Sequence, residues 1–147
     1  MYQDSNYLFE FFSLKNSRQN NIVKEPSIFT DHSFMLLPIA KVYEGVLKKI
    51  LVKVGVLLDE DLHDKPSVNV GAYFNPTGND KITRLLKDKA RDKVIPHVIY
   101  ATYQECRNEI FHYDEFRDKR IKTISDADFY RRRIIDAIYK AYDTFCV

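Results

Sequence analysis

The feature that most constrains the fold is a long apolar stripe between Phe34 and Val54. Apolar side chains recur there at steps of three and four residues, which is the period of one face of an α-helix. A helix of this kind is stable only when its apolar face packs against other elements. Thr30, Asp31 and Ser33 are candidate caps for its start, and the helix either stops at Gly55 or frays through Leu58. The segment therefore predicts a packed helical domain.

Four further segments have a helical pattern, and one long segment does not. The helical segments are Tyr2–Leu14, Asp80–Lys89, Ile95–His112 and a last one that starts at Ser125 and runs to Tyr142 or beyond. In the last helix we expect Ile134, Ile138 and Tyr142 to face the core. Asp59–Asn79 contains two prolines and two glycines, and we expect it to be irregular. Loops of that length are often functional, but a plain surface connection is an equal alternative.

Composition favours one helical domain. The 147 residues are 45% apolar and 30% charged, which is typical of a folded globular chain. Only 4 glycines and 5 prolines are present, fewer than many short strands joined by tight turns would need. We therefore expect a single domain over residues 1–147, all-α, with four or five helices in a bundle.

Charge and cysteine usage limit the functional classes. The formal net charge is only +2, so a nucleic-acid site must come from local clustering of cations. The chain starts with no signal-peptide pattern and has no apolar run long enough to cross a membrane. Cys106 and Cys146 suggest neither a disulfide framework nor a zinc site, and the histidines form no metal motif. We predict a cytoplasmic protein without a metal site, a cofactor or a membrane partner.

The stretch that carries candidate chemistry runs from Cys106 to Asp114. It places Arg107 five residues before His112, with the polar Asn108 directly after the arginine. On an ideal helix five residues turn about 500°, which leaves the two side chains about 140° apart. Asn108 and His112 share a face, whereas Arg107 does not. The arginine curls round, the helix ends near Phe111, or two copies of the motif meet across a two-fold axis.

The motif and its place late in a long helix resemble the HEPN ribonuclease domains. That resemblance implies a homodimer with a composite cleft built from both chains. It also implies metal-independent cleavage of RNA, in which the 2′-hydroxyl attacks the adjacent phosphate and leaves a 2′,3′-cyclic phosphate. A histidine suits general acid or base work, and an arginine offers permanent charge to phosphate oxygens. On this reading Arg107, Asn108 and His112 are catalytic.

A narrower resemblance concerns the stretch Lys41-Val-Tyr-Glu44-Gly45. It is similar to a helix of the RNase LS toxins that carries an arginine, two residues and a glutamate beside the arginine–histidine motif. Glu44 matches the acidic position, whereas Lys41 replaces the arginine and lacks its bidentate geometry. The resemblance implies that Glu44 and Lys41 belong to the catalytic site. It also implies a toxin or antiviral defence effector with an antitoxin or a regulatory partner.

Three further residues are candidates for RNA contact, and non-catalytic interpretations of the motif stay open. Tyr113 could stack on a base, and Arg131 and Arg132 could contact RNA phosphates. His112 could instead be a structural histidine at a helix terminus, and Arg107 a plain ion-pairing residue. The alternative function is a non-catalytic HEPN module that binds a nucleotide or a protein. A plain helical dimerisation domain is the third reading.

Overall fold

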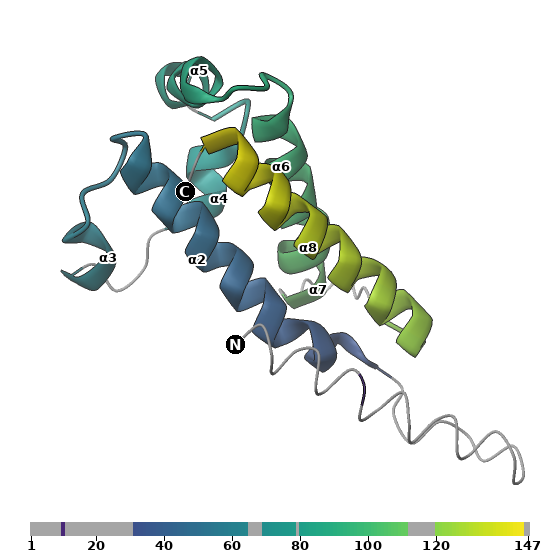
Figure 1. Cartoon of the computed structure of the whole chain (residues 1–147). Coiled ribbons are helices and arrows are strands. Elements are labelled where there is room, and N and C mark those ends of the chain that lie inside the picture. Colours follow the sequence, from purple (N-terminus) through teal and green to yellow (C-terminus); the bar gives the residue numbers. More distant parts are fainter. Residues whose placement is uncertain (1–9, 11–30, 65–68, 79, 112–119, 146–147) are drawn as a thin grey trace, which may run out of the picture.

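The computed structural model describes residues 10, 31–64, 69–78, 80–111 and 120–145. Every regular element among them is a helix, which confirms the predicted all-α bundle (Figure 1). The helix predicted over Tyr2–Leu14 lies, except for Glu10, outside the described residues. The elements are η1 (Ser33–Leu36), α2 (Leu37–Lys53), α3 (Asp61–Asp64), α4 (Val70–Phe74), α5 (Asp80–Lys89), α6 (Ile95–Tyr103), η2 (Gln104–Asn108), α7 (Glu109–Phe111) and α8 (Ile124–Phe145).

The predicted first long helix is present as η1 and α2. The Asp31 carboxylate accepts a hydrogen bond from the Ser33 N–H at 2.8 Å, so Asp31 satisfies a backbone donor at the start. Proline stands in the first turn of α2, where its missing N–H costs nothing. The helix ends just before Gly55, whose φ of 80° is a left-handed conformation that glycine adopts without strain. Asp31 was one of three candidate caps and Gly55 one of two possible ends, so both ends lie at positions that the sequence indicated.

The core lies between α2, α6 and α8. In Figure 1 α2 and α8 lie side by side, with α6 packed against α8. The buried Tyr43 hydroxyl has a hydrogen-bond partner inside this core, because it donates to the Ile99 carbonyl at 2.8 Å. Large side chains that are almost completely buried include Met35, Leu36, Ile39, Tyr43, Leu47, Ile50, Leu51, Ile99 and Ile134. Each full burial of such an aliphatic side chain contributes about 1.5–3 kcal/mol.

The prediction that Asp59–Asn79 is irregular is wrong in part. The segment contains two short helices, α3 and α4. In α4 the Asn69 side chain accepts from the Ala72 N–H, and Val70 and Phe74 are buried on one side. A single helical turn capped by asparagine is stabilised here by tertiary packing rather than by its own propensity.

The helix predicted over Ile95–His112 is present as far as Phe111, the last described residue of the segment, but it is interrupted by a π-helical turn. After Tyr103 the chain forms a π-helical turn, η2, which the Glu109 N–H closes on the Gln104 carbonyl. A π-turn holds one residue more than an α-turn and is often found at functional sites. Here it keeps Cys106 fully buried while its neighbours on either side pair with different helices.

The last helix, α8, begins one residue before the predicted Ser125 and extends to Phe145. Its start is satisfied by the Thr123 hydroxyl, which accepts from the Asp126 N–H at 3.0 Å. Ile134 and Ile138 are buried as expected, but Tyr142 is 39% exposed and was wrongly placed in the core. None of the described helices is long and apolar enough to cross a membrane.

Candidate active site

Arg107 and Glu44 meet across the gap between η2 and α2. The guanidinium Nη2 lies 3.4 Å from the Glu44 carboxylate, and the two residues are 63 positions apart in the chain. Their side chains are 21% and 15% exposed, so the pair is partly buried but open to solvent on one side. A distance of 3.4 Å exceeds the usual 2.7–2.9 Å of a charge-assisted hydrogen bond. The pair is therefore a long ion pair rather than a tight charge-assisted hydrogen bond.

Two lysines of α2 surround the same carboxylate. The Lys48 ammonium lies 3.2 Å from one carboxylate oxygen, and the Lys41 ammonium lies 3.8 Å from the other. Burial raises the pKa of Glu44, but the Lys48 hydrogen bond and the charges of Lys48, Lys41 and Arg107 outweigh it, so the pKa is lowered overall. Glu44 is thus ionised at neutral pH. One negative charge faces three positive ones, which leaves the cluster cationic.

Arg107 is held on three sides. Its guanidinium lies 5.5 Å from the centroid of the Tyr103 ring, within cation–π range. Its Nη1 donates to the Asn108 side-chain oxygen at 3.1 Å. Asn108 in turn donates to Gln104 at 3.0 Å, and Gln104 donates to the Tyr100 hydroxyl at 2.6 Å. These bonds run along the side of α6 and η2 and fix the orientation of the arginine.

The Tyr103 ring, which lies within cation–π distance of Arg107, packs closely against Gly71 of α4. A Cβ added at Gly71 of α4 would lie 2.9 Å from a ring carbon of Tyr103. Such a contact would push the ring out of place, because the ring is 3% exposed and tightly packed. The absence of a side chain at Gly71 therefore sets how closely α4 approaches the base of the site.

A small pocket opens at the Arg107–Glu44 pair. Its volume is about 90 Å³, and most of its lining surface is apolar. The lining residues are Leu37, Ala40, Lys41, Glu44, Arg107 and Phe111. Sites for whole small molecules usually measure about 300–1,000 Å³. The pocket is suited to a group of about the size of a phosphate rather than to a whole nucleotide.

A second ion pair fixes η2 from the opposite side. Glu105, two residues before Arg107, pairs with Arg133 of α8. The hydrogen bond from Arg133 to Glu105 raises the pKa of the guanidinium, and the Arg133 group also lies 5.7 Å from the Phe129 ring. The π-turn is thus tied to α8 through Glu105 and to α2 through Arg107.

The structure brings together four of the residues predicted from the sequence: Arg107, Asn108, Glu44 and Lys41. His112 and Tyr113 lie outside the described residues. Lys48 was missed, although its place four residues after Glu44 on one helix was a signal for the contact.

The two arginines predicted to contact RNA lie on α8. Both Arg131 and Arg132 pair with the Asp128 carboxylate. Burial raises the pKa of Asp128, but the hydrogen bonds from Arg132 and Arg131 outweigh it, and the pKa is lowered overall. One negative charge therefore faces two positive ones here, and RNA contact by Arg131 and Arg132 stays a prediction.

The fold and this cluster define a helical bundle with a small pocket that Lys41 and Arg107 border. Within the described residues no group of three or more His, Cys, Asp and Glu side chains is arranged to hold a metal ion. Comparison of the chain with protein-family models, curated proteins and solved structures yields no significant match. Membership of the HEPN family therefore rests on the motif and the site, and it stays a prediction.

Proposed function

We propose that this protein is a metal-independent endoribonuclease of the HEPN type. The observation that carries the proposal is the convergence of Arg107, Lys41 and Lys48 on Glu44 beside a pocket of phosphate size. The cluster includes Arg107, the arginine of the sequence motif. The histidine of that motif, His112, follows five residues later in the sequence. A cationic site that could hold a phosphate, together with a histidine five residues further along the chain, supports phosphodiester chemistry, because histidine is suited to general acid or base work.

In the proposed reaction the 2′-hydroxyl of RNA attacks the neighbouring phosphorus. The new O2′–P bond forms, the P–O5′ bond breaks, and the products are a 2′,3′-cyclic phosphate and a 5′-hydroxyl. His112 takes the proton from the 2′-hydroxyl or delivers one to the leaving oxygen. A homodimer would place a second His112 at the composite site to do the other transfer. Arg107 stabilises the charge that develops on the phosphate oxygens.

Glu44 has a supporting role in this proposal. Its carboxylate stays ionised because the surrounding cations lower its pKa, so it does not donate a proton near neutral pH. It holds the arginine toward the pocket and offsets the mutual repulsion of the three cations. Its removal would therefore misplace Arg107 rather than remove a reacting group.

An unrestrained ribonuclease activity limits the biological roles that this protein can have. Free RNA cleavage harms the cell that makes the enzyme, so we propose a toxin or defence effector that acts in the cytoplasm. An antitoxin or a regulatory protein would restrain it.

The test is cleavage of single-stranded RNA in the presence of EDTA. We expect the wild type to cleave, and His112→Ala and Arg107→Gln to lose about 10²–10⁴-fold in rate, the usual worth of positioned acid–base and charge-stabilising groups. Lys140→Gln is the matched control, because Lys140 pairs with Asp136 on α8 outside the pocket. Absence of cleavage by folded wild type across several RNAs would contradict the proposal and favour the non-catalytic module.

A further inference from the structure

The outer face of α8 carries two exposed aromatic side chains. Phe129 is 56% exposed and Tyr139 is 62% exposed, and they lie ten residues apart on the same helix. At about 100° per residue the two side chains point about 80° apart, so they share one side of α8. Exposed aromatic residues that occur singly need no explanation, whereas two on one helix face indicate a surface that can pack.

Two exposed charged residues lie between the aromatic residues. The Arg132 side chain is 75% exposed and the Asp136 side chain is 60% exposed. Phe129, Arg132, Asp136 and Tyr139 recur at steps of three and four residues, which is the spacing of the seam along which two helices pack in a coiled coil. We call these four residues the α8 face. Along the helix its order is aromatic, cation, anion and aromatic.

The α8 face points away from the rest of the bundle. The opposite side of α8 buries Ile134, Ala137 and Ala141 in the core, where α2 and α6 pack against it. Figure 1 shows α8 along the outside of the bundle. The described residues that line the Arg107 pocket belong to α2, η2 and α7. The α8 face is therefore a surface separate from the proposed active site.

The α8 face is complementary to a second copy of itself when the two helices run antiparallel. If the copies are symmetric about Ile134, Arg132 lies opposite Asp136 of the second copy, and Phe129 lies opposite Tyr139 of the second copy. The two-fold symmetry makes each contact occur twice. A shift of one heptad in either direction separates the aromatic residues. A parallel arrangement places arginine against arginine and aspartate against aspartate, which is repulsive.

The ion pairs within α8 are compatible with these contacts. In one chain Arg132 pairs with Asp128, and Lys140 pairs with Asp136. An ionised carboxylate has about four acceptor positions, so Asp136 can hold Lys140 of its own helix and Arg132 of the second copy together. The charges across the antiparallel pair therefore form a network, which contributes more than an isolated surface ion pair does.

We propose that two copies of this chain associate through the α8 face in an antiparallel arrangement. The inference goes beyond the proposed function, because the contact involves none of the proposed catalytic residues and needs no RNA. It is also distinct from the composite cleft of the proposed ribonuclease, which would bring Arg107 and His112 of two chains together.

The size of the α8 face predicts a weak and reversible association. A fully buried aromatic side chain covers about 150–250 Å², so four side chains that are each a little over half exposed contribute roughly 300–600 Å². Stable interfaces bury at least about 1,200 Å² in total, and smaller ones are transient. We therefore expect a Kd of about 100 µM, with monomers at low micromolar concentrations.

The experiment measures self-association of the full chain by sedimentation velocity between about 5 and 500 µM. Asp136→Arg sets an arginine against Arg132 of the second copy, and Arg132→Asp sets an aspartate against Asp136 of the second copy. Each variant alone should associate at least about tenfold more weakly than the wild type. An equimolar mixture of the two variants restores both opposite-charge contacts, so it should form a heterodimer with about the Kd of the wild type.

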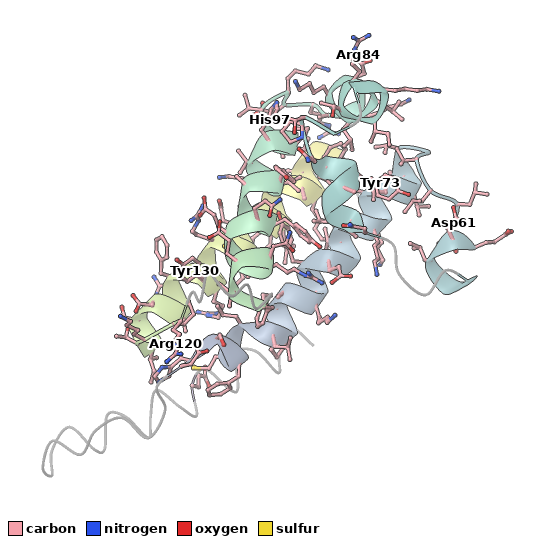
Figure 2. All side chains as sticks on the ribbon, turned by 180° about the vertical axis from the view of Figure 1, so that it is seen from behind. Asp61, Tyr73, Arg84, His97, Arg120 and Tyr130 are labelled. Carbon is pink, nitrogen blue, oxygen red and sulfur yellow. The ribbon has the colours of Figure 1, made fainter. Side chains whose placement is uncertain are left out.

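The matched controls are Glu60→Arg and Arg84→Asp, which change the net charge by the same amounts outside the α8 face. Glu60 precedes α3, and Arg84 of α5 points away from the bundle (Figure 2). Both controls should associate as the wild type does. Phe129→Ala with Tyr139→Ala should weaken association about tenfold and leave the helical circular dichroism unchanged.

Three results would overturn the α8 contact. The first is a wild type that stays monomeric at every concentration. The second is association that Asp136→Arg or Arg132→Asp leaves unchanged, as expected if a different surface joins the copies. The third is a mixture of these two variants that stays monomeric. Since no RNA is present, each result is independent of whether the protein is a ribonuclease.

Discussion

The Arg107–Glu44 pair can be tested by a double-mutant cycle on protein stability. Across 3.4 Å two unit charges attract by about 5 kcal/mol at an effective dielectric constant of 20 and by about 1.2 kcal/mol at that of water. The side chains are 21% and 15% exposed, which places the pair between these limits. Partial desolvation of both groups offsets some of the attraction. We therefore expect a coupling energy of about 1–2 kcal/mol.

The assay is urea unfolding of the wild type, Glu44→Gln, Arg107→Gln and the double variant at neutral pH. The internal reference is the cycle for Glu44 and Lys41, whose ammonium lies at 3.8 Å and whose side chain is 59% exposed. That pair should couple by about 0–0.5 kcal/mol. Equal coupling energies in the two cycles would refute the claim that burial makes the Arg107 contact the stronger one.

Three further predictions concern the surroundings of the site. The lowered pKa of Glu44 stabilises the fold above the pKa of the unfolded carboxyl, and this contribution is lost as pH falls through the folded pKa. The stability difference between wild type and Glu44→Gln should therefore shrink as pH falls below the usual glutamate pKa of about 4.3, as measured by urea unfolding. Gly71→Ala should cost about 1–3 kcal/mol by displacing the Tyr103 ring, and an unchanged melting temperature would contradict this contact. Deletion of Gln104 should turn the π-turn into an α-turn, which keeps the helical circular dichroism but abolishes RNA cleavage.

The long helices could be predicted because their periodicity extends over many turns and their ends carry recognisable residues. Gly55 ends α2 through its positive φ, and the acidic first turn of α8 places its start within one residue. The short helix α4 was missed because one turn is too short for a periodic pattern and depends on the packing of Val70 and Phe74. Tyr142 was predicted to lie in the core because it shares the spacing of Ile134 and Ile138, but the packing of α8 leaves it partly exposed.

Only part of the site was predicted from the sequence, and that part came from a resemblance rather than from periodicity. Its residues come from two segments far apart in the chain, and a resemblance rather than periodicity linked Glu44 to Arg107. The π-turn could not be foreseen, because one added residue barely changes the apolar pattern of Ile95–Phe111. The ion pair of Glu105 with Arg133 depends on the packing of α8 against η2, which the local sequence does not specify.

The central claim is that the Arg107 pocket and His112 cleave RNA without a metal ion. The most direct measurement is mass spectrometry of the ends produced by the wild type from a defined single strand in EDTA. We expect 2′,3′-cyclic phosphates and 5′-hydroxyls from the wild type, and neither from His112→Ala. Linear 3′-hydroxyl and 5′-phosphate ends, or identical products from wild type and His112→Ala, would contradict it.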